Sequence, residues 1–319
     1  MRPAFSVIFF TVMSGCGYGL LFLFGLALAF NPAVSGRIEG LVQLGVGAIF
    51  VVAGLLASTL HLGQPQRAWR AFSQWRSSWL SREGVASVAS FMPMVLIAGC
   101  LWRGADATTL RALGALLAAF AAITVICTAG IYTSLKAIPA WHNRFVLPGY
   151  LLMALLGGAA WSWLIGEWTG GARAQPALIV ALAIASCVLK HFYWRHIDAA
   201  TPASTIETAT GLGRFGRVRS VEAPHTEENY LTHEMGFQLA RKHGKRLRNI
   251  ALLLLGPCTI VLALLAITFQ APLHWPAACC AFAAAILVTA GLFVERWLFF
   301  AQAKHVVMLY YGGARMHDA

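Results

Sequence analysis

Long apolar runs separated by short polar stretches dominate the pattern of hydrophobic and polar positions along this chain. A helical run of about 20 apolar residues spans the roughly 30 Å hydrocarbon core of a bilayer. Hydropathy predicts eight such helices, with ends that can shift by several residues. They are expected at 5–30, 40–62, 84–102, 109–134, 146–166, 177–197, 248–269 and 277–301. The pattern therefore predicts an all-α integral membrane protein, a bundle of eight transmembrane helices.

The composition and the connections agree with this interpretation. Of the 319 residues, 59% are hydrophobic and 11% are charged, whereas soluble domains carry about 25% charged residues. The first run is longer than the apolar core of a signal peptide, about 7–15 residues, so we expect it to be a span. The connections are short except between spans six and seven. We therefore expect a single membrane domain over 1–319, with a cytoplasmic insertion at about 198–246.

Basic residues are distributed unevenly between the two sides of the predicted bundle. Eight spans place both termini and the loops after spans two, four and six on one side. That side carries 20 of the 24 Lys and Arg residues. Cytoplasmic loops are enriched in Lys and Arg, so we expect both termini to be cytoplasmic in a bacterial inner membrane. The same bias accounts for the net charge of +12, and we expect membrane lipid rather than nucleic acid as a partner.

Motifs for a bound cofactor are weak in this sequence. The seven cysteines lie within or at the ends of apolar runs without a C-x-x-C spacing, so we expect packing residues rather than iron–sulfur or zinc ligands. Gly211-x-Gly213-x-x-Gly216 follows no strand, so we interpret it as a chance match to the dinucleotide pattern. Two histidines on different spans could ligate haem, but no pair is clearly placed in mid-membrane. We therefore do not expect haem b.

The segment 61–84, between spans two and three, has the densest set of candidate functional side chains. His61 ends one span and Glu83 begins the next, and the short connection predicts a similar depth for the two. A histidine can hydrogen-bond a quinone oxygen and take its proton, and a carboxylate can pass on a second proton. Trp69, Trp75 and Trp79 suit a membrane interface. A quinone site is one interpretation of these residues, and a boundary histidine among ordinary anchoring residues is the other.

Other ionisable groups are predicted near the same side. Glu295 and Arg296 lie inside the last apolar run, and Lys190 ends span six. Ionisable residues within a span are functional candidates, because burying a charge in a membrane is costly. The alternative is that Glu295 and Arg296 neutralise each other or other buried groups.

The pattern H-L-G-x-P-x-R-A at 61–68, followed by L-S-x-E at 80–83, resembles the DmsC family. These are the membrane-anchor subunits of dimethyl sulfoxide reductase-type molybdoenzymes, and the SoeC-type anchors of sulfite dehydrogenases are similar. The resemblance extends over the whole chain. It includes the Ile138-Pro139-Ala140-Trp141 turn and the Glu295-Arg296…Phe299-Phe300 end. The tryptophan-rich loop and the long insertion depart from the enteric dimethyl sulfoxide reductase anchor, which leaves the substrate of the complex open.

The resemblance implies a complex of three subunits. A molybdopterin subunit would be catalytic, an iron–sulfur subunit would carry electrons, and this chain would exchange them with menaquinone or ubiquinone. It implies functional roles for His61 and Glu83, and we expect Arg67, Arg70 and Trp79 to complete the quinone site. No iron–sulfur or molybdenum ligands are expected in this chain. The alternatives are a multi-span transporter, disfavoured because the charges collect at one end of the spans, and a purely structural anchor.

Overall fold

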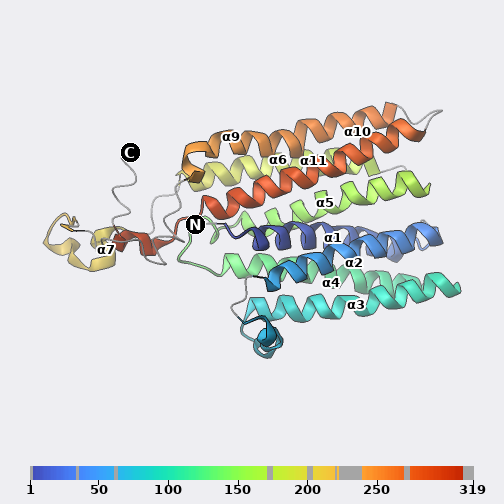
Figure 1. Cartoon of the computed structure of the whole chain (residues 1–319), viewed down its shortest axis with the longest axis horizontal. Helices are drawn as coiled ribbons and strands as arrows, with labels where there is room; N and C mark the ends of the chain where they lie inside the picture. Colours follow the sequence, from blue (N-terminus) through green and yellow to red (C-terminus); the bar gives the residue numbers. More distant parts are fainter. Residues whose placement is uncertain are drawn as a thin grey trace.

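The structure is a computed structural model that describes residues 3–33, 36–60, 64–170, 175–199, 204–219, 221–222, 239–268 and 274–311. In these ranges eight helical spans are long and apolar enough to cross a membrane, and no strand is present. The helices run side by side along the long axis of the molecule (Figure 1). The predicted all-α fold with eight spans is therefore confirmed.

Each of the first six spans is a single helix. They are α1 (Phe5–Phe30), α2 (Arg37–Thr59), α3 (Trp79–Arg103), α4 (Ala107–Thr133), α5 (Val146–Thr169) and α6 (Gln175–Ala199). The start of the third span differs from the prediction. It begins at Trp79 rather than near residue 84, because the side chain of Ser78 caps the helix by accepting the backbone N–H of Ser81. Glu83 consequently lies one turn inside the helix.

The seventh span is interrupted and the eighth is continuous. The seventh consists of α9 (Leu239–Leu253), the π-helical turn η3 (Leu254–Cys258) and α10 (Thr259–Thr268), and the eighth is α11 (His274–Ala301). Pro257 lies in the π-helical turn, where its missing N–H breaks the regular hydrogen-bond ladder. The hydroxyl of Thr259 donates to the Leu254 carbonyl at 2.7 Å and satisfies one of the freed acceptors.

Helix α1 is the centre of the bundle and packs against α2, α4 and α5, while α11 packs against α5. The crossing of α1 and α5 leaves no room for side chains. A Cβ atom on Gly19 would lie 1.8 Å from the Ala154 carbonyl oxygen, and one on Gly158 would lie 2.1 Å from the Gly19 carbonyl carbon. Glycine at both positions lets the two backbones touch, as is common where transmembrane helices pack closely.

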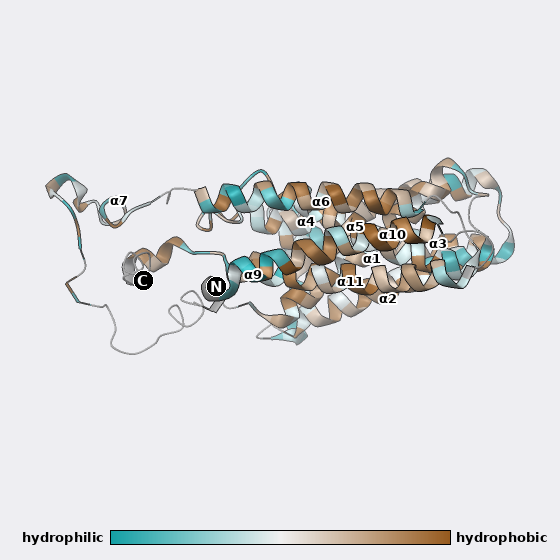
Figure 2. Ribbon diagram, turned by 90° about the horizontal axis from the view of Figure 1, so that it is seen from above, coloured by the Kyte–Doolittle hydropathy of each residue, from teal (hydrophilic) through white to brown (hydrophobic). Residues whose placement is uncertain are grey.

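One end of the bundle, called here the basic end, carries the short helices outside the spans. These are η1 (Pro65–Gln74), α7 (Ile206–Thr210), η2 (Leu212–Phe215) and η4 (Val306–Tyr311). Hydrophobic residues fill the middle of the helices and hydrophilic residues gather toward their ends (Figure 2). Gly211 follows the helix α7 rather than a strand, which agrees with a chance match to the dinucleotide pattern.

Candidate functional site

Glu83 is a buried carboxylate close to the basic end of the bundle. Its residue is 4% exposed, and the hydroxyl of Thr128 from α4 donates to its Oε1 atom. The cap at Ser78 sets the start of α3 and thereby the face on which Glu83 lies. A carboxylate at this depth is desolvated, so its hydrogen-bond partner from the neighbouring helix is essential to keeping it there.

Trp79 lies on the same face of α3 as Glu83, one turn earlier. Its ring fits against Gly130 of α4, where an added Cβ atom would come within 2.6 Å of the ring. The guanidinium of Arg82 stacks over the Trp79 ring at 4.6 Å. The structure therefore brings together Trp79 and Glu83, two of the predicted site residues, against α4.

Arg67 and Arg70 occupy a different position, on the exposed helix η1. The guanidinium of Arg70 lies 5.6 Å from the centre of the Trp69 ring. Within the described part of the chain, Thr128 is the hydrogen-bond partner of Glu83, and neither arginine forms an ion pair with it. Their expected contact with the quinone remains a prediction. His61 lies outside the described residues, so its expected role also remains a prediction.

Helix η1 presents an aromatic and basic surface, because none of its residues is buried. Trp69 is 66% exposed, and Phe72 and the following Trp75 are also exposed. The segment is held at its end by Arg82, whose Nε donates to the Trp75 carbonyl at 3.0 Å and whose Nη2 donates to the Arg76 carbonyl at 2.6 Å. The Ser81 hydroxyl also donates to the Ala71 carbonyl. A surface helix is thereby fixed against the first turns of α3, close to Glu83.

A second buried cluster joins α11 to α6. The Nε atom of Arg296 donates to Oε2 of Glu295 at 2.6 Å, and Lys190 forms an ion pair with the other carboxylate oxygen. All three residues are buried. Glu295 and Arg296 form an ion pair with each other, as the alternative interpretation of the sequence described, and Glu295 also pairs with Lys190. The third member, Lys190, was seen in the sequence only as the polar end of span six, without a signal for its partner.

Aromatic rings fill the space beside this cluster. The guanidinium of Arg296 stacks on the Tyr150 ring at 4.0 Å. Trp141 packs edge-on against Tyr132 at 5.2 Å and donates its Nε1 hydrogen to the Phe299 carbonyl at 3.0 Å. The turn at 138–141 and the end of α11, two segments that carried the family resemblance, are therefore in direct contact.

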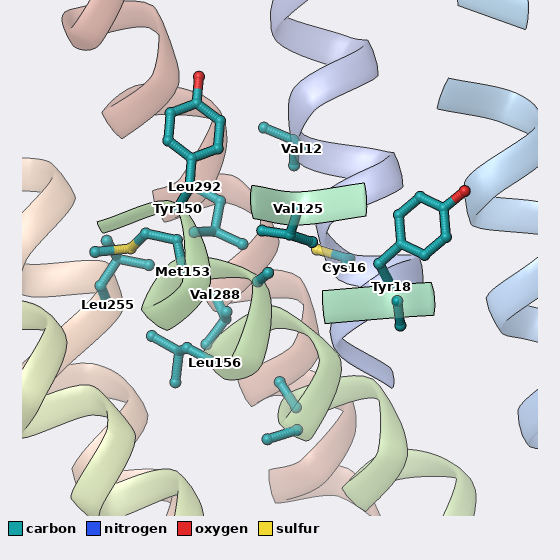
Figure 3. Packing of buried hydrophobic residues seen from close by; sticks show 14 of the residues in the cluster. Val12, Cys16, Tyr18, Val125, Tyr150, Met153, Leu156, Leu255, Val288 and Leu292 are labelled. Atoms are coloured by element: carbon teal, nitrogen blue, oxygen red, sulfur yellow. The ribbon is translucent and has the colours of Figure 1, made fainter. Parts of the chain in front are cut away.

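A small cavity of about 20 Å³ lies inside the bundle between α1, α4, α5 and α11. Six polar residues contribute to its wall. They are Thr11, Ser14, Tyr18, Thr128, Tyr150 and Arg296. Tyr18 and Tyr150 lie on opposite sides of Val12, Cys16 and Val125 (Figure 3). The cavity thus separates Thr128, the partner of Glu83, from the ion cluster of α11.

Metal or disulfide chemistry finds no support in the described part of the chain. That part holds no group of three or more His, Cys, Asp or Glu residues placed to bind a metal ion. All seven cysteines, which the structure describes, are free thiols. The Thr128 hydroxyl can hydrogen-bond Glu83 in either protonation state, because a hydroxyl can both donate and accept a hydrogen bond.

Comparisons with known proteins agree with these features. The C subunit of the sulfite dehydrogenase of Allochromatium vinosum is 32% identical, over 98% of this chain and 99% of that protein. The C polypeptide of the anaerobic dimethyl sulfoxide reductase of Escherichia coli (strain K12) is 25% identical, over 64% of this chain and 72% of that protein. The family model described as the DMSO reductase anchor subunit (DmsC) matches residues 1–311. The protein therefore belongs to the DmsC family of membrane-anchor subunits.

Proposed function

We propose that this protein is the quinone-reactive anchor of a three-subunit molybdoenzyme. It would exchange electrons between membrane menaquinone or ubiquinone and an iron–sulfur subunit, and would hold that subunit and a molybdopterin subunit at the membrane. Family membership supports the anchor role. The proposed location is the bacterial inner membrane, with the basic end facing the cytoplasm.

The observation that carries the quinone reaction is the buried carboxylate of Glu83. Quinone reduction adds two protons as well as two electrons, so the site needs groups that exchange protons close to the ring oxygens. Glu83 is 4% exposed and hydrogen-bonded to Thr128, yet it lies only one helical turn from the start of α3. Ionisable groups inside spans are costly and mark functional sites. We propose that His61 contacts a quinone oxygen and that Glu83 relays protons, with Arg67, Arg70 and Trp79 completing the site.

The surface of η1 supports a docking role. Its exposed arginines can attract acidic groups of an iron–sulfur subunit, and its exposed tryptophans can bury apolar area against a partner or at the membrane interface. Because η1 is tied to the start of α3, a partner bound there would lie close to Glu83. Electron transfer between the bound partner and the quinone would then need no redox centre in this protein.

The comparisons favour a sulfite dehydrogenase over a dimethyl sulfoxide reductase as the type of complex. The relative from the sulfite enzyme matches nearly the full length of both proteins, whereas the relative from the dimethyl sulfoxide reductase matches 64% of this one. We therefore propose sulfite as the substrate of the catalytic subunit. Sulfite-dependent and dimethyl sulfoxide-dependent activities of the purified complex distinguish the two.

The test is the change Glu83→Gln in the intact complex, with His61→Ala in parallel. Both variants should lose quinone-linked turnover by about 100-fold or more, since they remove groups that handle protons. Dye-linked activity of the soluble subunits and their membrane attachment should stay unchanged. Glu39→Gln is the matched control, because Glu39 is also buried but bonds Gln43 near the start of α2, away from the basic end. Full quinone-linked turnover in Glu83→Gln would contradict the proposal, and loss of attachment would favour a purely structural anchor.

A further inference from the structure

The cavity between α1, α4, α5 and α11 has the size and polarity of a water site. Its volume is about 20 Å³, and a water molecule needs about 10–15 Å³ together with two to four polar partners. Hydroxyl groups and one guanidinium supply polar atoms in its wall, and the remaining residues are apolar. An apolar cavity of this size would stay dry, so the polar wall is the feature that points to a ligand.

Three residues that line the cavity have a buried polar atom without a hydrogen-bond partner in the described part of the chain. The atoms are Nη1 of Arg296 and the hydroxyl oxygens of Tyr150 and Tyr18. Arg296 is 4% exposed, and its Nε atom is already committed to Glu295. A buried donor without an acceptor destabilises a folded protein, so such groups are generally satisfied by protein or by ordered water. An oxygen placed in the cavity would accept from the guanidinium and exchange a hydrogen bond with Tyr150.

Thr128 also lines the cavity, and its hydroxyl has two acceptors but only one proton. The acceptors are Oε1 of Glu83 and the Thr124 carbonyl, the latter at 3.0 Å. When Glu83 is ionised, Thr128 can donate to the carboxylate. When Glu83 is protonated, the acid can donate to Thr128, whose proton then turns to the Thr124 carbonyl. The contact therefore suits both protonation states of Glu83 without movement of any heavy atom.

We propose that the cavity binds one water molecule and that Thr128 passes protons between this water and Glu83. The role of Thr128 in turnover rests on the proposed quinone reaction. The presence of a water molecule in the cavity does not depend on it. Thr128 is then a positioning and relay residue for Glu83, and Arg296 and Tyr150 hold the water. The ion cluster of Lys190, Glu295 and Arg296 then has a second role besides joining α6 to α11. It provides the charged side chain that binds the water molecule in the cavity.

Protons and electrons balance for quinone reduction at this site. The iron–sulfur partner supplies two electrons, and the O–H bond of protonated Glu83 breaks as a quinol O–H bond forms. The resulting carboxylate is reprotonated in one concerted shift, in which it takes the Thr128 proton while Thr128 takes a proton from the water and the water takes one that comes from solvent at the basic end. A second proton reaches the other quinone oxygen through His61. Quinol oxidation runs through the same steps in reverse.

The test compares Thr128→Val with Thr128→Ser in the whole complex in membranes. Valine keeps the shape but removes the hydroxyl, so quinone-linked turnover should fall by about 10- to 100-fold and its solvent deuterium isotope effect should rise. Serine restores the hydroxyl, so turnover should stay within about threefold of the wild type. Thr133→Val is the matched control. Thr133 is half-buried near the end of α4, and its hydroxyl donates to the Gly130 carbonyl at 3.3 Å rather than to Glu83.

Two results would overturn the inference. One is normal turnover with an unchanged isotope effect in Thr128→Val, and the other is equal impairment in Thr128→Ser. A density map of the complex fine enough to show waters gives a measurement independent of turnover and of variant folding. It should show a peak between Thr128 and Arg296, and an empty cavity would refute the water site. Normal quinone-linked turnover in Glu83→Gln would contradict the proposed quinone role. Loss of that turnover in Glu83→Gln together with normal turnover in Thr128→Val would contradict only the relay through Thr128.

Discussion

At the scale of single residues, Glu295 is the group on which two buried cations depend. It contacts Lys190 through one carboxylate oxygen and Arg296 through the other, and all three residues are buried. Such a cluster is weak evidence for net stability, because each charge loses its hydration. Removing the Glu295 charge, in contrast, is destabilising, because Lys190 and Arg296 then stay buried without a counter-charge.

We predict that Glu295→Gln destabilises the anchor by about 3–5 kcal/mol, the usual cost of breaking a buried ion pair. The thermal midpoint of the purified complex and the amount of anchor in membranes are the measurements. Asp198→Asn is the control. It breaks the pair of Arg248 with Asp198, whose side chain is 58% exposed, and exposed pairs contribute about 0–1 kcal/mol. Equal effects of the two changes would show that the buried cluster has no special role in stability.

The buried polar residues could be predicted from the sequence only in part. Glu83 could be singled out, because a carboxylate at the start of an apolar run is conspicuous. Thr128 could not, because a threonine inside an apolar run usually bonds its own helix backbone. Its contact with Glu83 depends on how α3 and α4 are rotated against each other. The pairing of Lys190 with Glu295 depends likewise on α6 and α11 lying close together, which hydropathy does not encode.

At the scale of elements, η1 is a surface helix without buried residues that is nevertheless fixed to the bundle. We predict that charge reversal of Arg67, Arg70 and Arg76 together releases the soluble subunits from membranes at raised salt. Single changes should be mild, since each exposed ion pair contributes about 0–1 kcal/mol. Sedimentation of the iron–sulfur subunit with membranes over a salt series measures the effect.

The control for this experiment is charge reversal of Arg37, Arg103 and Arg111, which are exposed at the opposite end of the bundle. That variant should retain the soluble subunits at every salt concentration at which the wild type does. Retention by the η1 variant as well would place the docking surface elsewhere. Release by both variants would indicate a general loss of charge balance rather than a docking surface at η1.

Element boundaries were less predictable than element number. The number of spans follows from the bilayer, which demands about 20 apolar residues per helix. The start of α3 was expected five residues too late, near 84, because Trp79, Ser81 and Arg82 lower the local hydropathy. The cap at Ser78 decides the boundary instead. This short extension carries the site, since it includes both Trp79 and Glu83.

At the scale of the whole molecule, the uneven distribution of charge predicts an orientation. Twenty of the 24 Lys and Arg residues belong to the side that carries the basic end. We predict that the basic end faces the cytoplasm, because basic loops resist transfer across the membrane. Single cysteines at Ser73 on η1 and at Thr108 on α4, both exposed positions, test this in a variant without native cysteines.

An impermeant thiol reagent added to intact cells with the outer membrane opened should label Thr108→Cys and leave Ser73→Cys unlabelled. Ser73→Cys should react once the inner membrane is permeabilised, which serves as the control for its accessibility. Labelling of Ser73→Cys but not of Thr108→Cys in intact cells would show that the basic end faces the periplasm. The proposed proton exchange at Glu83 would then occur on the periplasmic side.

The contact of α1 with α5 restricts how a quinone can arrive. Their backbones touch at Gly19 and Gly158, and Ala154 at this crossing also borders the cavity. The interior therefore cannot widen there to admit a ring. Helix α3, by contrast, lies at the edge of the bundle (Figure 1) and exposes Leu80, one helical turn before Glu83. If Glu83 serves the proposed quinone reaction, we predict that the quinone enters sideways from the lipid with its isoprenoid tail still in the bilayer, so tail length would contribute little to recognition.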